Sequence, residues 1–148
     1  MRQLVSSTEK AYLAGFLDGD GSIYVQAKPN KTYRYGFQVA PYVVLYQSKK
    51  GESSFKRLCS LIGLGYIRER KDGILEYIIG REKNIELFLK IIAPYVLLKK
   101  GQVKLTLEII RRKSLVKNRK DFISLMKLID RFRELNYSKK RLTRILTP

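Results

Sequence analysis

Two carboxylates, Asp18 and Asp20, stand on either side of Gly19 directly after an apolar segment. That segment is predicted to be a helix, and the carboxyl end of a helix carries partial negative charge, which disfavours anions. A bound cation would relieve this conflict, and oxygen ligands suit a hard cation such as Mg²⁺. The pair therefore predicts a divalent metal site. A polar turn is the alternative, because paired carboxylates are common in turns.

The residue types that are missing restrict the chemistry further. The chain has no His and a single Cys, Cys59. This excludes a zinc finger, a histidine general base, a Cys–His pair and a disulfide within the chain. If the protein is an enzyme, its chemistry must rest on Asp, Glu, Lys, Arg, Gln, Tyr or Ser.

The charge balance indicates a negatively charged partner. There are 31 Lys and Arg against 13 Asp and Glu, a net charge of +18, which is more than solubility requires. Nucleic acid is the expected partner, because phosphate contacts provide most of the non-specific affinity. No apolar run reaches the roughly 20 residues that would cross a membrane, and the first residues do not resemble a signal peptide. We therefore expect a soluble intracellular protein without a membrane partner.

The elements that must position the carboxylates begin with a helix. Ser6 and Glu9 form a capping-box signature, and the apolar residues that follow predict a helix ending near 18–21. Ala11, Gly15 and Gly19 are spaced four apart on it. Small residues at this spacing let two helices approach closely, so a paired helix would bring two such carboxylates together.

The rest of the chain alternates between strands and helices, and we read residues 1–148 as a single domain. Strands are predicted at 22–28, 35–47, 65–70 and 74–79, and further helices at 55–62, 83–92, 99–112 and 120–135. Pro41 implies a bulge or a sheet edge. The order predicts an α+β fold, an antiparallel sheet with helices on one face. Its free face is rich in Tyr, Gln, Arg and Lys.

The segment Leu13–Gly21 reads LAGFLDGDG, which resembles the signature of the LAGLIDADG homing endonucleases. The single copy resembles the homodimeric branch of the family. The resemblance implies an αββαββα core with a DNA-binding sheet and extra C-terminal helices. It implies a site-specific, metal-dependent endonuclease that hydrolyses both strands of a long pseudo-palindromic DNA site. Two alternatives stay open: a relative that assists RNA splicing, and a non-catalytic nucleic-acid-binding protein such as a ribosomal protein.

The resemblance also implies roles for individual residues. Asp20 from each subunit would bind the metal with the carbonyl of Gly19; Mg²⁺ or Mn²⁺ would support cleavage, and Ca²⁺ would bind without supporting it. Ala11, Gly15, Asp18 and Gly19 would lie at the dimer interface. Gln47 would orient a water, and Lys99, or alternatively Lys100, would offset charge on the phosphate. Related enzymes often have a basic residue after the glutamine; here Lys49 or Lys50 would substitute for it.

The polar face of the sheet is the expected reading surface, because a two-stranded ribbon fits the major groove. Two subunits would cover roughly 20 base pairs. Basic residues of the tail, Lys139 and Lys140, are expected to grip phosphates. At the family level, the resemblance suggests an organelle (chloroplast or mitochondrion) or an archaeal cytoplasm. The residues expected to point toward bases are Tyr24, Gln26, Lys28, Asn30, Tyr33, Gln38, Tyr42, Arg68, Arg70, Glu76 and Ile78.

Overall fold

The computed structural model describes residues 5–136 of the chain. Its elements are, in chain order, α1 (Ser7–Asp20), β1 (Gly21–Pro29), β2 (Phe37–Ser48), the short 3₁₀ helix η1 (Lys49–Gly51), α2 (Glu52–Ile62), β3 (Tyr66–Glu69), β4 (Ile74–Ile79), α3 (Glu82–Ile92), the 3₁₀ helix η2 (Ala93–Tyr95), α4 (Lys100–Lys113), α5 (Arg119–Asp130) and α6 (Phe132–Leu135). The predicted α+β class and the predicted order of helices and hairpins are confirmed.

Helix α1 begins at the predicted capping box. The Ser6 hydroxyl accepts the backbone N–H of Glu9 at 3.1 Å, and the Glu9 carboxylate accepts the backbone N–H of Ser6 at 2.8 Å. The helix continues through Asp20 and passes directly into β1. A side chain at Gly21 would meet Leu17 at 2.6 Å, so this direct junction requires glycine. Both carboxylates therefore lie in the last helical turn rather than in a loop.

The four strands form one antiparallel sheet in the order β1-β2-β4-β3. Strand β1 pairs with β2 along its whole length, from Gly21 opposite Leu45 to Pro29 opposite Phe37. Strand β4 pairs only with the second half of β2, from Val43 onward. Pro41 therefore lies where β2 has no β4 neighbour, and the unbroken register shows an edge rather than a bulge.

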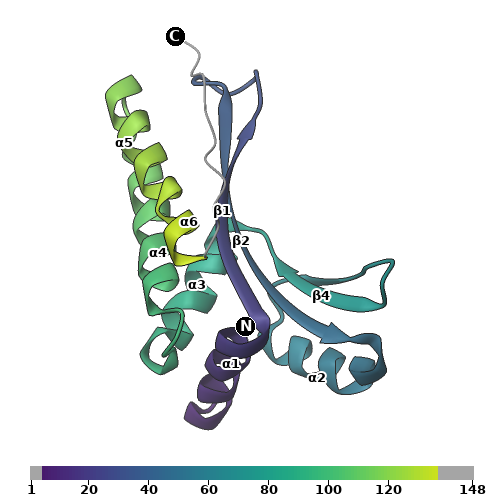
Figure 1. The fold of residues 1–148 in the computed structure, drawn as a ribbon. Helices are drawn as coiled ribbons and strands as arrows, with labels where there is room; N and C mark the ends of the chain where they lie inside the picture. The colour runs from purple at the N-terminus through teal and green to yellow at the C-terminus, as the bar shows by residue number, and fades with distance from the viewer. Residues whose placement is uncertain (1–4, 137–148) are drawn as a thin grey trace.

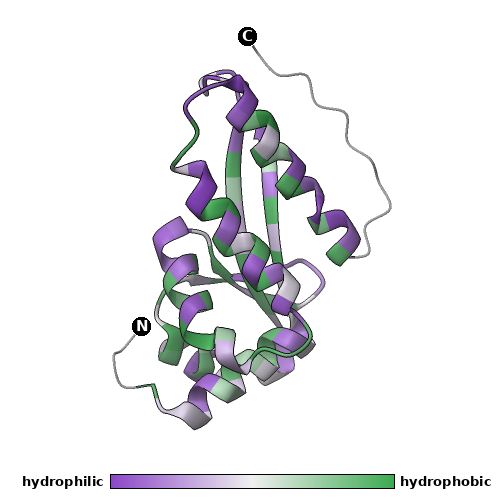
Figure 2. Cartoon of the chain, turned by 90° about the vertical axis from the view of Figure 1, so that its left-hand side faces the viewer, coloured by the Kyte–Doolittle hydropathy of each residue, from purple (hydrophilic) through white to green (hydrophobic). Residues whose placement is uncertain are grey.

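The helices cover one face of the sheet and leave the other open. Helices α4 and α5 lie against β1, and α1 and α3 both pack against β2 (Figure 1). The core between them includes Ile23, Val43, Phe88 and Ile109, all fully buried. Figure 2 shows hydrophilic and hydrophobic segments alternating along these helices, as expected for amphipathic helices with one buried side.

Two element boundaries differ from the prediction by three residues or more. The helix expected at 120–135 is divided into α5 and α6, because the N–H of Arg131 bonds to the carbonyl of Leu128, three residues back. No Gly or Pro marks this break, and Phe132 continues the buried stripe across it. Helix α2 begins at Glu52, earlier than expected, after η1. None of the helices in residues 5–136 is long and apolar enough to cross a membrane.

Candidate functional site at the end of α1

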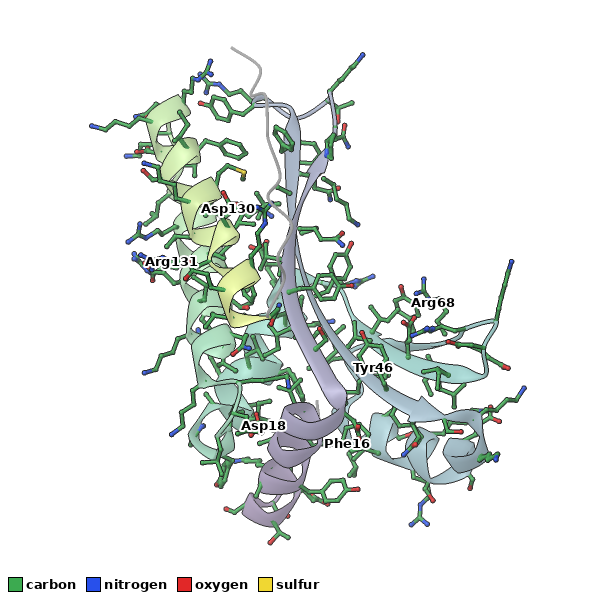
Figure 3. All side chains as sticks on the ribbon, viewed as in Figure 1. Phe16, Asp18, Tyr46, Arg68, Asp130 and Arg131 are labelled. Atoms are coloured by element: carbon green, nitrogen blue, oxygen red, sulfur yellow. The ribbon has the colours of Figure 1, made fainter. Side chains whose placement is uncertain are left out.

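The carboxylate of Asp18 is fully engaged within its own chain. One oxygen accepts the backbone N–H groups of Leu97 at 2.8 Å and Leu98 at 3.1 Å, and the other accepts that of Lys99 at 3.0 Å. Figure 3 shows Asp18 on the side of α1 that faces α4. Partial burial raises the pKa of Asp18, but the three backbone donors and the Lys99 cation outweigh it, so the pKa lies below its usual value.

Lys99 lies at the carboxyl end of α1. It is the residue before α4, and its ammonium donates to the backbone carbonyl of Asp18 at 2.8 Å. A cation here is favourable because the end of a helix exposes carbonyl groups with partial negative charge. The lysine that sequence reasoning selected is thus brought within two residues of Asp20. Its alternative, Lys100, is the exposed first residue of α4.

Asp20 has a different environment from Asp18. It is exposed, and its carboxylate makes no hydrogen bond or ion pair with any residue between 5 and 136. The last turn of α1 contains no basic residue. An exposed carboxylate beside the carbonyls of a helix end is a set of oxygen donors, which fits a hard divalent cation. Within residues 5–136, however, no three acidic, Cys or His side chains converge. Because Asp18 is already engaged by three backbone N–H groups, one chain offers a cation only the carboxylate of Asp20 at this helix end.

Gln47 lies near the end of β2, alongside the carboxyl end of α1. The pairing of Gly21 with Leu45 places it there. Its side chain is half-buried, and its side-chain oxygen accepts the backbone N–H of Ser48 at 2.9 Å. A Cβ at Gly51 would come within 3.3 Å of the Gln47 Cγ. Of the two candidate lysines that follow, Lys49 forms an ion pair with Glu69 at 2.8 Å. Lys50 forms none with the residues that the structure describes, which makes it the more available cation.

An apolar surface lies beside the same helix end. Ala11, Gly15 and Gly19 are exposed on one side of α1, and a Cβ at either glycine would meet nothing within 4 Å. Nothing within residues 5–136 therefore requires glycine there. Leu97 and Leu98, whose backbones bind Asp18, are 73% and 78% exposed, and Tyr12 is 61% exposed. Sequence reasoning missed these three residues, although two adjacent leucines before Lys99 were a usable signal.

On the open face, side chains form rows that follow the strand register. The first row beyond the end of α1 contains Tyr46, Glu76 and Arg68, and the next contains Ser22, Val44, Ile78 and Tyr66. Beyond these lie Tyr24 with Tyr42, Gln26 with Ala40, and Lys28 with Gln38. The predicted strand residues share this face, and Figure 3 shows Tyr46 and Arg68 on it. Tyr46, Val44 and Tyr66 also lie on this face but were not among the residues predicted to point toward bases.

Several of these side chains contact one another. The rings of Tyr24 and Tyr42 stack at 5.2 Å, and the Lys28 ammonium lies 4.7 Å from the centre of the Tyr42 ring and donates to its hydroxyl. Burial, with a smaller contribution from nearby Glu76, raises the pKa of Tyr24 and Tyr46. Both phenols therefore remain neutral hydrogen-bond donors at neutral pH.

Two residues on this face are less accessible than we expected. Glu76 and Ile78 are each only 7% exposed; both lie on β4, where side chains of β2 and β3 flank them on either side. Asn30 and Tyr33 lie in the β1–β2 loop, where the Asn30 side-chain oxygen accepts the backbone N–H of Thr32 at 3.0 Å. Arg70 follows β3 and pairs with Asp72. Lys139 and Lys140 lie outside the described residues.

The family model "LAGLIDADG endonuclease" matches residues 13–107, which contain α1 from Leu13 onward, the whole sheet and Lys99. The chain belongs to the LAGLIDADG endonuclease family. The chain is 36% identical over 133 residues to the DNA endonuclease I-CreI of Chlamydomonas reinhardtii, covering 89% of this chain and 81% of that protein. It is 33% identical over 134 residues to the DNA endonuclease I-CvuI of Chlorella vulgaris, covering 88% and 81%.

Solved structures of the family have the same fold. The crystal structure of I-CvuI with its DNA target in the presence of Ca matches with a TM-score of 0.83 and 29% identity, over 92% of this chain and 87% of that one. I-CvuI with an I-CreI target in the presence of Mg, where the DNA is not cleaved, matches with a TM-score of 0.82 and 28% identity, over 94% and 87%. The expected family fold is therefore confirmed.

Proposed function

We propose that this LAGLIDADG chain is a site-specific endonuclease that binds a long, pseudo-palindromic double-stranded DNA site as a homodimer and cuts both strands. The observation that carries the proposal is the contrast between the two carboxylates at the end of α1. The negative charge of Asp18 is compensated by backbone N–H groups of its own chain. Asp20 lies exposed at the same helix end, which is unfavourable for an anion. The relatives I-CreI and I-CvuI are both DNA endonucleases, which supports the proposed activity.

A divalent cation is the natural counterion for Asp20, with the carbonyl of Gly19 as a second ligand. We propose Mg²⁺, with Mn²⁺ as a substitute and Ca²⁺ as an ion that binds without supporting cleavage. Bound there, the metal would lower the pKa of a water and stabilise charge on the phosphodiester. The I-CvuI complexes in the presence of Ca and Mg support divalent metal use in the family.

We propose that a second copy of the chain supplies the second carboxylate that one chain lacks. Two α1 helices that pack along Ala11, Gly15 and Gly19 would approach closely because no side chains intervene. Their carboxyl ends would then bring together an Asp20 from each subunit. The exposed Leu97, Leu98 and Tyr12 would be buried by this contact, which removes a large apolar patch from water.

We propose that three polar side chains assist at the phosphate. Lys99, whose ammonium donates to the carbonyl of Asp18, is proposed to offset negative charge that develops on the phosphodiester. Gln47 is proposed to orient a water from the end of β2, and Lys50 to supply the basic residue that follows it.

The protein's net charge of +18 would draw DNA to the open face of the sheet, where the polar side chains of the strands would reach base edges. We further propose that each subunit covers about ten base pairs, roughly 20 in all. An organellar or archaeal origin stays a prediction.

Incubation with a randomised-site DNA library, with Mg²⁺ and separately with EDTA, followed by sequencing of cut ends, tests the proposal. We expect discrete double-strand breaks at one long pseudo-palindrome in the reaction with Mg²⁺, and none in the reaction with EDTA. Binding to DNA without cleavage under Mg²⁺ or Mn²⁺ would overturn the endonuclease assignment and favour an RNA-splicing or structural role.

A further inference from the structure

Two tyrosine rings form a platform on the open face of the sheet. The rings of Tyr24 on β1 and Tyr42 on β2 stack with their centres 5.2 Å apart and their planes 26° from parallel. The two residues are directly paired across the strands, so the strand register fixes their separation. Tyr42 also lies beside Gly80, the residue after β4, where a Cβ would come within 3.7 Å of its ring. The Tyr24–Tyr42 platform is therefore built on rigid strands rather than on a loop.

The polar end of Tyr42 is already engaged within the chain. Its hydroxyl accepts a hydrogen bond from the Lys28 ammonium, which also lies 4.7 Å from the centre of the Tyr42 ring. The hydrogen bond and the attraction between the cation and the ring both hold this side chain in place. What Tyr42 can offer to a DNA base is therefore chiefly the carbon surface of its ring.

The platform lies in the least polar part of the open face. The row that contains Tyr24 and Tyr42 has no amide, guanidinium or carboxylate side chain. The neighbouring rows add Val44 and Ile78 on the side toward α1 and Ala40 on the outer side, each row having one polar side chain from β1. Hydrogen-bonded recognition of a base requires polar side chains with matching donors or acceptors. A base pair that faces this row would instead meet an apolar, aromatic surface.

We propose that the Tyr24–Tyr42 platform reads the C5-methyl group of a thymine in each half-site. Among the four bases, thymine alone presents a methyl group in the major groove, and apolar and aromatic side chains are the groups that contact it. This inference rests on the proposed DNA-binding function and deepens it. It assigns to these two tyrosines an apolar contact through their rings, in place of a hydrogen bond through their hydroxyls.

The strand register also indicates where this thymine lies. Gly21 begins β1 at the end of α1, and Tyr24 is three residues further along the strand, which is roughly 10 Å at about 3.4 Å per residue. Duplex DNA rises by about 3.4 Å per base pair. The thymine should therefore lie about three base pairs outward from the carboxyl end of α1. It should lie closer to the centre of the site than the base pairs that face Gln26 and Lys28.

The experiment first selects the preferred DNA site by binding in Ca²⁺, and then replaces each thymine in turn, in both half-sites, by deoxyuridine. Deoxyuridine lacks only the methyl group, and the affinity of the wild-type protein is measured by mobility shift. At one symmetric pair of thymines the affinity should fall about fourfold for each methyl group, roughly 15-fold for the pair. At this position 5-methylcytosine should bind better than cytosine by a similar factor. Full affinity with uracil at every position would overturn the proposal.

Three variants assign the lost affinity to the platform. Tyr24→Phe keeps the ring and should keep the full penalty for uracil, whereas Tyr24→Ala should reduce the penalty to less than twofold at that thymine alone. Tyr66→Ala is the matched control, because Tyr66 is a 59% exposed tyrosine of β3 on the same face, and it should keep the penalty. A penalty lost in Tyr24→Phe would assign the contact to the hydroxyl, and one lost in Tyr66→Ala would assign it to β3. Either result would overturn the proposal.

The uracil penalty is a ratio of two affinities of the same protein, so partial unfolding of a variant lowers both affinities and leaves the ratio unchanged. If Tyr24→Ala does not fold, Tyr24→Gln replaces the ring by an amide of similar length and should bind the thymine and uracil sites equally. Failure to select any site would overturn the proposed DNA binding and this inference with it. A selected site without a uracil penalty would overturn this inference alone, and absence of cleavage would defeat only the proposed endonuclease.

Discussion

The carboxyl end of α1 and the open face of the sheet differ in how completely each is assembled within one chain. On the open face, Lys28 is bonded to Tyr42 and Arg68 to Glu76. At the end of α1, Asp18 is matched by three backbone N–H groups, but Asp20 has no partner within residues 5–136. The open face, which we propose reads DNA, is thus largely preorganised, whereas the end of α1, which we propose is catalytic, would need a cation and a second chain to complete it.

This difference follows from what each region must do. Base recognition gains when side chains are already oriented, because less conformational entropy is lost on binding. A metal ligand must instead leave its lone pairs free until the cation arrives.

The largest effect is expected from Asp20→Asn at the catalytic end. The amide keeps the shape of the side chain but removes the charge that would hold the cation, so the rate of cleavage should fall by about 10³-fold or more. Affinity for DNA should change little, because the open face is untouched. Cleavage assays in Mg²⁺ beside a mobility-shift titration measure both, with Asp72→Asn as the matched control. Full cleavage by Asp20→Asn would refute the role of this carboxylate.

Gly15→Ala should separate folding from assembly. Within one chain the added methyl group meets nothing within 4 Å, and alanine in a helix is favoured over glycine by roughly 1 kcal/mol, so the chain should fold at least as well. A closely packed α1–α1 contact would not accommodate the methyl groups, so dimerisation should weaken about tenfold or more. Sedimentation over a concentration series checks this. An unchanged dimer would place the interface elsewhere.

Asp18→Asn should affect stability more than chemistry. Loss of the charge weakens its hydrogen bonds to the backbone at 97–99 and should destabilise the fold by about 1 kcal/mol. The pKa of Asp18 is lower in the folded chain than its usual value, so its contribution is present above about pH 4 and is lost as the pH falls through the folded-state pKa. Urea unfolding at pH 7 and pH 3 should show the gap between wild type and variant closing at the lower pH. A gap that widens there would contradict the assignment.

The smallest effect is expected from Tyr42→Phe on the open face. The ring still stacks on Tyr24, so only the hydroxyl that accepts from Lys28 is lost. Stability should change by about 0.5 kcal/mol or less, since the pair is exposed. Urea unfolding of the variant measures this, and a loss of several kcal/mol would show that the contact holds the β1–β2 ribbon together.

Local sequence signals predicted the elements and the strand faces, but they could not predict contacts between residues that are far apart in the sequence. The capping box at Ser6 and the alternation along β1 are local patterns, so periodicity was sufficient to find them. The bond between Asp18 and the backbone of Leu97 joins positions far apart in the chain, and no local pattern encodes it. The burial of Glu76 likewise depends on Tyr46 and Arg68 from two other strands.

The way in which Asp18 is held at the end of α1 shows the same limit. The unfavourable helix end could be recognised from sequence, and it correctly indicated that a positive group was needed. For Asp18 that group comes from the chain itself, through Lys99 and three N–H donors. The break between α5 and α6 had no signal at all, because a single displaced N–H at Arg131 produces it without Gly or Pro.

The most direct test of a shared catalytic centre is cleavage by a purified heterodimer of one wild-type and one Asp20→Asn subunit, each carrying a different affinity tag. If the two Asp20 carboxylates serve a common centre, this heterodimer should bind the DNA site normally but make almost no double-strand breaks in Mg²⁺. Double-strand cleavage at half the wild-type rate or more would show that one Asp20 is sufficient, and would contradict the shared centre.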